Sequence, residues 1–364
     1  MPTSLGGVGV LKSRYFFAAA LAAASLPANA QTAQDQQALA VVGGQPYRHA
    51  NSGITIPPTL AGLPLTSTKQ YEAPELDVMF EFSNASEVLS LYIYRAPSGS
   101  IPVWFDRGVW AAETQSRLGA LSRVAIGTLP TPHQSVEAGM YAVWKPQQGP
   151  YTATALALAP LGQWIVKLRY STKSADAGAL AARLPTIYAE LQWPQAVAQA
   201  PAAKPVEACA TALRFQGRAK PVKPDGAAVL LGAVLSQMAA SPERPNDASE
   251  GPPTLWCRDP AQVENAAVYR ANASTDSYLI ALSDAGRGIS VSPSAAGTLL
   301  GKGKDKPSWN IDLILPGRTL NFPAVDRLPA PPQAVEALRG KPVSAVTTWG
   351  KDRNVEVQGG AFAK

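Results

Sequence analysis

The stretch TATALALAPLGQWIVKLRYS, residues 152–171, decides the fold of the first half of the chain. Apolar residues alternate on both sides of Pro160-Leu161-Gly162-Gln163, a pattern typical of two strands joined by a turn. An even-numbered loop would pair Ala159 with Trp164 and so set the register of the hairpin. On one face of the hairpin, large residues then lie opposite alanines. The expected pairs are Trp164 with Ala159, Val166 with Ala157, Leu168 with Ala155, and Tyr170 with Ala153. We expect a helix to pack over that face.

The other face of this hairpin carries two cations, Lys167 and Arg169, beside Ile165. One hypothesis is that the two cations hold a ligand. A simpler one is that their aliphatic stems cover Leu156 and Leu158 while the charged ends stay in water. We favour the second interpretation, which predicts that replacing both cations with methionine lowers solubility and leaves function intact.

The rest of residues 48–194 predicts strands and helices around this hairpin. A second hairpin is expected at 78–94, a helix opened by Ser100 and Pro102, and a further strand at 139–145. A closing helix is indicated by Leu180, Leu184, Ile187 and Leu191, which recur at helical spacing. Pro185 is expected to kink that helix or to start a second one, because a proline inside a helix costs about 3 kcal/mol.

The chain is long enough for two domains, and its composition suggests the boundary. Residues 195–205 are rich in Ala and Pro and read as an extended linker between domains at 48–194 and 206–364. The second domain should begin with a helix at about 226–240, capped by Asp225 and free of charge, which we expect to be buried. Strands follow, with predicted positions 277–283, 288–292, 309–315, 343–349 and 354–358. Both domains are therefore predicted to be α+β.

The order of elements in the first domain resembles the PsbP-like fold, in which helices flank an antiparallel sheet. The residues that carry the resemblance are Ile54-Thr55-Ile56-Pro57, the hairpin at 78–94, Gly162-Gln163-Trp164-Ile165-Val166 and Trp193-Pro194. It covers about residues 50–194 and offers no site motif, so no functional residue is carried over. The resemblance implies a non-enzymatic assembly or binding role. The resemblance does not extend to the second domain, which stays unassigned.

The N-terminus has the three parts of a secretory signal peptide over residues 1–30. Lys12 and Arg14 precede the apolar run 15–26, and Ala28-Asn29-Ala30 forms the expected cleavage site before Gln31. Residues 31–47 are predicted to be disordered. No other segment reaches the roughly 20 apolar residues that span a bilayer, so we expect a periplasmic or secreted protein without a transmembrane segment.

The two cysteines, Cys209 and Cys257, both lie in the exported part of the chain. An oxidising compartment favours a disulfide between them, stabilising the fold by about 4 kcal/mol; the alternative is two separately buried thiols. After removal of the signal peptide, 30 basic residues face 26 acidic ones, a net charge of +4. That excess is too small to indicate a nucleic-acid partner.

The sequence offers no catalytic or metal-binding motif, and it implies no cofactor. His49 and His133 are the only histidines, neither has a metal-ligand spacing, and His133 is expected in an exposed loop. No motif of a serine nucleophile is present. Asp77, Glu81 and Asp312 are acids on predicted strands that a glycosidase could pair, although solvated strand positions explain them as well.

One basic cluster, Lys302, Lys304 and Lys306 among glycines, is a possible anion-binding loop; the alternative is a solvated connection. We therefore expect a non-enzymatic binding or accessory protein of the cell envelope, whose partner is an envelope protein or an anionic envelope component. Two alternatives stay open. One is an envelope hydrolase that uses an unrecognised carboxylate pair, and the other is a structural partner of a membrane complex.

Overall fold

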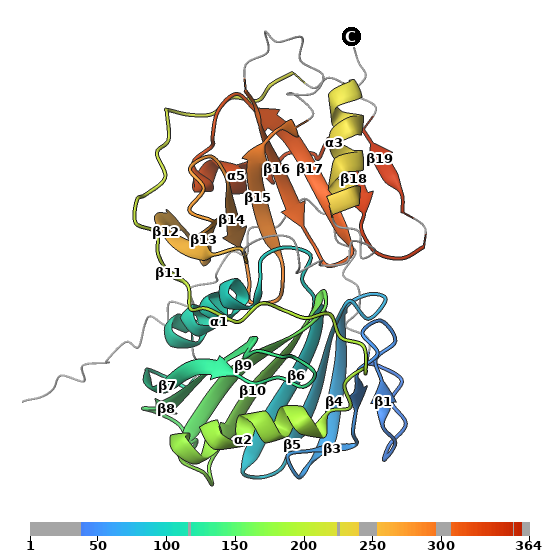
Figure 1. Ribbon diagram of the computed structural model, residues 1–364, viewed down its shortest axis with the longest axis vertical. Coiled ribbons are helices and arrows are strands. Elements are labelled where there is room, and N and C mark those ends of the chain that lie inside the picture. The colour runs from blue at the N-terminus through green and yellow to red at the C-terminus, as the bar shows by residue number, and fades with distance from the viewer. Residues whose placement is uncertain are drawn as a thin grey trace, which may run out of the picture. The chain divides into compact units, whose positions relative to one another are not determined.

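The computed structural model describes residues 38–115, 118–223, 226–239, 253–295, 307–351 and 353–358 (Figure 1). The signal peptide predicted over residues 1–30, the helix cap Asp225 and the cluster Lys302, Lys304 and Lys306 lie outside these residues. Within the described residues, no helix is long and apolar enough to cross a membrane.

The first half of the described chain forms an eight-stranded antiparallel sheet in the order β3-β4-β5-β6-β10-β9-β8-β7. Its strands are β3 (Thr59–Leu60), β4 (Leu63–Glu72), β5 (Asp77–Ser83), β6 (Glu87–Arg95), β7 (Leu121–Leu129), β8 (Gly139–Pro146), β9 (Ala153–Leu161) and β10 (Trp164–Thr172). Helix α1 (Ile101–Gln115) follows β6, and α2 (Ala177–Glu190) follows β10. The two helices pack on opposite faces of the sheet, because α2 joins the cluster of Val166 and Leu168, whereas α1 joins that of Leu158 and Ile165. The sheet thus has a helix on each face; the PsbP-like relationship stays a prediction.

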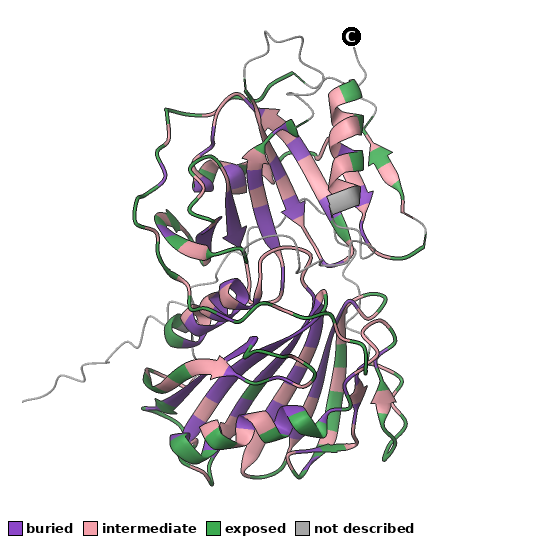
Figure 2. Ribbon diagram, in the orientation of Figure 1, coloured by how far each residue is buried: buried purple, intermediate pink, exposed green. Residues whose placement is uncertain are grey.

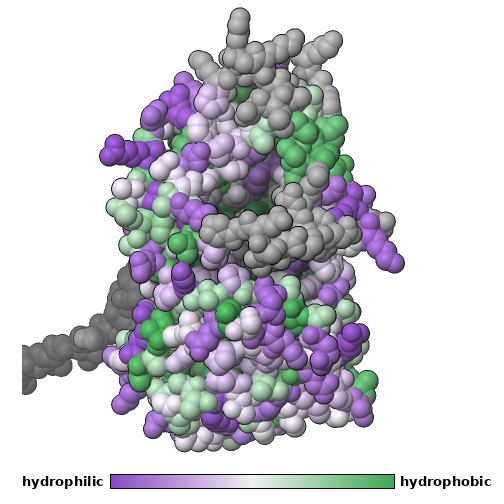
Figure 3. Space-filling model, viewed as in Figure 1, coloured by the Kyte–Doolittle hydropathy of each residue, from purple (hydrophilic) through white to green (hydrophobic). Residues whose placement is uncertain are grey.

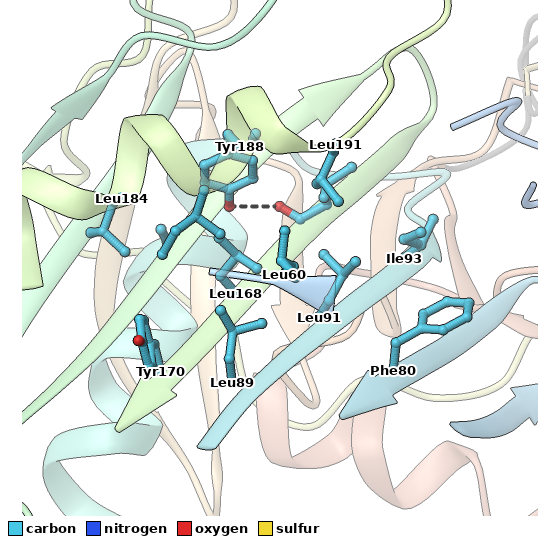
Figure 4. Packing of buried hydrophobic residues seen from close by; sticks show 14 of the residues in the cluster. Leu60, Phe80, Leu89, Leu91, Ile93, Leu168, Tyr170, Leu184, Tyr188 and Leu191 are labelled. Carbon is cyan, nitrogen blue, oxygen red and sulfur yellow. Dashed lines mark hydrogen bonds between the residues drawn. The ribbon is translucent and has the colours of Figure 1, made fainter. Parts of the chain in front are cut away.

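The hairpin of β9 and β10 has the predicted faces but not the predicted register. Val166, rather than Trp164, pairs with Ala159, because β9 continues through Pro160 and Leu161 and only Gly162 and Gln163 form the turn. The error is two residues, so every side chain keeps its face. As expected, the face of Val166 and its alternate neighbours lies under a helix, α2 (Figure 4).

Helix α2 buries the predicted apolar stripe, including Leu180, Leu184 and Ile187. It begins after Asp176, whose side chain accepts a hydrogen bond from the Ala179 N–H at 2.8 Å. The helix continues through Pro185, so no second helix begins there. Tyr188 links the helix to β10, because its buried hydroxyl donates to the Val166 carbonyl at 3.0 Å (Figure 4).

The second half forms a nine-stranded sheet whose strands follow one another in chain order. They are β11 (Glu207–Ala208), β12 (Trp256–Val263), β13 (Ala266–Ala271), β14 (Tyr278–Ala281), β15 (Gly288–Pro293), β16 (Trp309–Ile314), β17 (Arg318–Val325), β18 (Ser344–Thr347) and β19 (Val355–Val357). All pair antiparallel except β11, which lies parallel to β12. Helix α3 (Gly226–Ala239) contacts β18 and β19, and α5 (Pro331–Ala337) contacts β12 and β15. The predicted mixture of helix and sheet is confirmed.

Cys209 and Cys257 form the predicted disulfide, with an S–S distance of 2.01 Å. It joins the start of the second half to β12, where Glu207 pairs with Cys257 in the sheet. The bond therefore closes the polypeptide between these residues, 48 positions apart, into a loop.

The segment predicted to be disordered, residues 31–47, is partly ordered. Leu39 and Val41 pack on the core of the first sheet, and the Leu39 N–H donates to Thr68 Oγ1 at 3.1 Å. Tyr47 opens the two-stranded ribbon of β1 (Tyr47–Arg48) and β2 (Thr55–Ile56), and its ring lies 5.4 Å from that of Phe80. The few apolar residues of this segment are enough to hold it on the sheet.

Helix α3 is not buried as expected from its uncharged sequence. Only Ala233 is buried among its described side chains, and most of the helix surface is half-buried or exposed (Figure 2). The reason is that α3 lies at the end of the sheet, against the short strands β18 and β19, which cover one side of it. On another side of the helix, Leu230 and Val234 are exposed.

Candidate functional site

Lys167 lies on the face of the first sheet that also carries α1, and there it meets a turn of the second half. Its Nζ lies 3.0 Å from Asp284 Oδ2 and donates to the Asp284 carbonyl at 3.2 Å. The ammonium also lies over the Tyr92 ring, 4.7 Å from its centroid. Since the side chain is only 4% exposed, the expectation that this charge stays in water is wrong.

Two glycines allow the turn between β14 and β15 to approach so closely. Gly286 has φ +74°, and a Cβ there would lie 3.0 Å from the Arg95 carbonyl oxygen. On α1, a Cβ at Gly108 would meet Leu156 at 2.8 Å and Asp284 at 3.8 Å. A side chain at Gly286 would press the turn away from β6, whereas one at Gly108 would first clash with Leu156.

Each member of the Lys167–Asp284 pair shifts the pKa of the other toward its charged form. Burial acts to raise the pKa of Asp284, but the charges of Lys167 and Arg169 outweigh it and lower that pKa to about 2. Burial lowers the pKa of Lys167, and Asp284 opposes the shift. Arg169 lies 4.0 Å from Asp284 and is 43% exposed, so the prediction of a water-facing cation holds for Arg169 alone.

Asp77, one of the acids considered for catalysis, is also engaged by the second half of the chain. Arg287, three residues after Asp284, places Nη1 2.6 Å from Asp77 Oδ2 and Nη2 3.5 Å from Glu72. Burial raises the pKa of Asp77, and the Arg287 charge opposes that shift. This carboxylate therefore serves a contact between the two sheets.

The other acids do not join Asp77. Asp312 lies on β16 of the second sheet, where burial raises its pKa to about 6 and Asn321 donates to it at 2.8 Å. Glu81 is half-buried on β5 of the first sheet. No described group of three or more His, Cys, Asp or Glu residues has the geometry of a metal site.

Two arginines of the first half extend the contact between the sheets. Arg95 Nη1 donates to the Pro316 carbonyl at 2.6 Å, and burial together with the Arg353 charge lowers the pKa of Arg95 to about 10. Arg107 on α1 donates through Nε to the Ala281 carbonyl at 3.3 Å. Buried side chains of both sheets also pack in one cluster: Ala142, Leu156 and Ile165 from the first, and Tyr269, Leu279 and Ala281 from the second. We call this set the inter-sheet contact; sequence reasoning missed it, because its partners are far apart in the chain.

His49 is the one histidine in a buried position, and its surroundings include a serine and a glutamate. Nδ1 lies 2.7 Å from Ser52 Oγ, while Nε2 lies 2.8 Å from the Glu75 carbonyl oxygen and 3.8 Å from its carboxylate. The Ser52 N–H also donates to Nδ1, at 3.1 Å. Because the imidazole is fully buried and binds main-chain groups, it fastens the 49–54 turn to the 73–76 turn. His133 lies exposed in a loop, as predicted.

The described surface offers a different feature on α3. Ala227, Leu230 and Val234 form an exposed stripe at helical spacing, which we call the α3 stripe; Leu230 is 47% and Val234 38% exposed. Figure 3 shows hydrophobic residues gathered where α3 lies. The helix has no charged residue to accompany this stripe. An apolar pattern around the whole helix was the only signal in the sequence, and it was interpreted as burial inside this chain.

No known protein family, curated protein or solved structure matches the chain.

Proposed function

We propose that this is a non-enzymatic accessory protein of the cell envelope that binds another envelope protein through the α3 stripe. The observation that carries the proposal is an uncharged helix with exposed Leu230 and Val234. Soluble proteins rarely leave such a helix face uncovered without a partner. Because the two side chains are already about half-buried, covering the rest of them would contribute about 1–3 kcal/mol to binding.

Two further observations support this role. The pattern of residues 1–30 and the Cys209–Cys257 disulfide fit an exported protein. The charged groups of the inter-sheet contact are paired with each other: Lys167 with Asp284, and Asp77 with Arg287. These pairs hold the two sheets together, and α3 packs on the second of them.

Photocrosslinking in cells that naturally produce the protein tests the proposal. A benzophenone amino acid at Leu230 should give one discrete protein adduct. The same group at Ser67, an exposed position on the first sheet, should give none. Val234→Asp should abolish the adduct, because a carboxylate in an apolar interface is costly to desolvate.

The outcomes separate the possibilities. An adduct with an envelope protein at Leu230, lost in Val234→Asp, supports the proposal. Equal crosslinking at Leu230 and Ser67 would indicate unspecific contact and overturn it. An adduct with a second copy of this chain would assign the α3 stripe to self-association instead.

A further inference from the structure

The two sheets differ in how their edges are protected. An edge strand presents unpaired N–H and C=O groups to any other strand, and native proteins limit this with short edge strands, charges, prolines and bulges. Three of the four edges end in very short strands: β3 and β11 have two residues each, and β19 has three. These three edges leave little main chain to pair.

The strands next to β3 and β11 are longer than these edge strands, so part of their main chain is left unpaired. Other features protect that part of β4 and of β12. β4 carries Lys69 and two register irregularities, and the Leu39 N–H donates to Thr68 on it. β12 contains Pro260 and a register irregularity between Asp259 and Val263. Both strands are therefore poor templates for a further strand.

β7 is the exception. It has nine residues, contains neither lysine nor proline, and pairs only with β8 in the described part of the chain. Its one irregularity lies between Arg123 and Ala125; from Ala125 to Leu129 the pairing is unbroken. Val124 is 56% and Ile126 47% exposed, so apolar side chains accompany the open edge.

We propose that β7 pairs antiparallel with β7 of a second copy, so that the chain forms a dimer in which two eight-stranded sheets join edge to edge. Antiparallel pairing about a twofold axis lets one strand be its own partner. The charges permit it, because Arg123 is the only ionic residue of β7 and lies 2.5 Å from the Glu113 carboxylate of its own copy. Pairing would also cover Val124 and Ile126 of both copies.

Sedimentation velocity of the full mature chain over a wide concentration range tests the dimer. We expect a monomer–dimer equilibrium whose dissociation constant rises at least about tenfold in the Val124→Lys, Ile126→Lys double variant, because two like charges would then face each other across the new edge. Val222→Lys places the same charge on another exposed valine, in the second half of the chain, and should leave the equilibrium unchanged.

Disulfide trapping gives a second measurement that does not depend on charged variants. The two native cysteines are bonded to each other, so Ile126→Cys introduces the one free thiol. Oxidation should link this variant into a covalent dimer, whereas Val222→Cys should stay monomeric.

A chain that remains monomeric at all concentrations and gives no trapped dimer overturns the proposal. So does a dimer that survives the β7 variants and dissociates in Leu230→Lys, which would place self-association on α3. A monomer that binds an extended peptide at β7 would also overturn it, in favour of a peptide ligand. Failure of the β7 dimer leaves the α3 proposal standing, because the two rest on different surfaces.

Discussion

Lys167 shows how one residue can join distant parts of the chain. It sits in the middle of a strand, and its partner Asp284 lies 117 positions later, in a turn of the other sheet. A lysine in such a place is stable only while its ammonium is paired, because an unpaired buried charge is costly. The aliphatic stem alone therefore does not explain why the position holds a lysine.

The first prediction separates Lys167 from its neighbour Arg169. Lys167→Met leaves Asp284 without its closest cation, and we expect a loss of about 3–5 kcal/mol in the free energy of unfolding. Arg169→Met, the matched control, should cost less than about 1 kcal/mol, because Arg169 is largely solvated. Urea unfolding of both variants measures the difference; equal losses would contradict the role given to Lys167.

A second prediction concerns the buried His49. Burial lowers the pKa of His49 below its usual value, and the Glu75 interactions only partly oppose this. The folded state therefore binds the proton less readily than the unfolded state, so this contribution to stability is present above pH 6.5 and is lost as the pH falls through the lowered pKa. His49→Gln should reduce the loss of stability between pH 7 and 5. His133→Gln, in an exposed loop, should lose as much stability over this range as the unchanged protein. An identical dependence of the unfolding free energy on pH in both variants would refute the prediction.

The contribution of Asp312 to stability should change with pH in the direction opposite to that of His49. Its pKa is raised to about 6, so its stabilising contribution is present at pH 4 and is lost as the pH rises from about 4 to 6. Asp312→Asn keeps an oxygen for the Asn321 amide and removes the charge. We expect it to stabilise the protein at pH 7 by up to about 3 kcal/mol and to have no effect near pH 4. Unfolding free energies measured at both pH values test this, and a gain of equal size at both would contradict it.

At the scale of elements, side-chain alternation was predictable and exact pairing was not. The period of two in residues 152–171 assigned Val166 and Leu168 to the face covered by α2, which the structure confirms. It did not distinguish a turn of two residues from one of four, so the register was wrong by two. Periodicity reports which residues share a face, but the turn length depends on local backbone conformation.

Helix α3 shows the limit of that reasoning. Its composition predicts that all sides are covered, but it does not specify whether this chain or another molecule covers them. In the described structure the cover is one-sided, with Ala233 buried and Leu230 exposed. The candidate surface was therefore visible in the sequence only as an uncharged segment.

Gly286, in the turn between β14 and β15, offers a second test of the inter-sheet contact. Gly286→Ala puts a methyl group 3.0 Å from the Arg95 carbonyl, in addition to the strain of φ +74°. Gly217 has φ +68° with no atom within 4 Å of a Cβ, so Gly217→Ala reports the backbone strain alone. We expect about 1 kcal/mol of destabilisation at Gly217 and about 1–3 kcal/mol more at Gly286. Chemical denaturation of the two variants checks this; equal costs would mean that the turn does not pack tightly on β6.

At the scale of the whole molecule, the α+β class and the disulfide could be predicted, because hydrophobic periodicity indicates the helices and strands and only two cysteines are available to pair. The inter-sheet contact could not, since it joins Lys167 to Asp284 and Asp77 to Arg287 across more than a hundred residues. No local pattern relates such positions. Sequence reasoning therefore placed the Lys167 ammonium in water and left Asp77 as a catalytic or a solvated acid, although the fold pairs both with residues of the second sheet.

This contact predicts that the two sheets unfold together. Separating them would leave Lys167 and Asp77 without their partners and would expose Tyr269, Leu279 and Ala281, which pack in one cluster with residues of the first sheet. The cost of these losses should exceed the entropy gained by releasing one sheet alone, so neither sheet should persist without the other. Differential scanning calorimetry of the mature chain should show one transition, with a van't Hoff enthalpy close to the calorimetric enthalpy. Two resolved transitions would mean that the contact joins independently stable bodies, and Lys167→Met should then leave the transition of the second sheet unshifted. If the two sheets form a single cooperative unit, Lys167→Met should instead lower the temperature of the one transition.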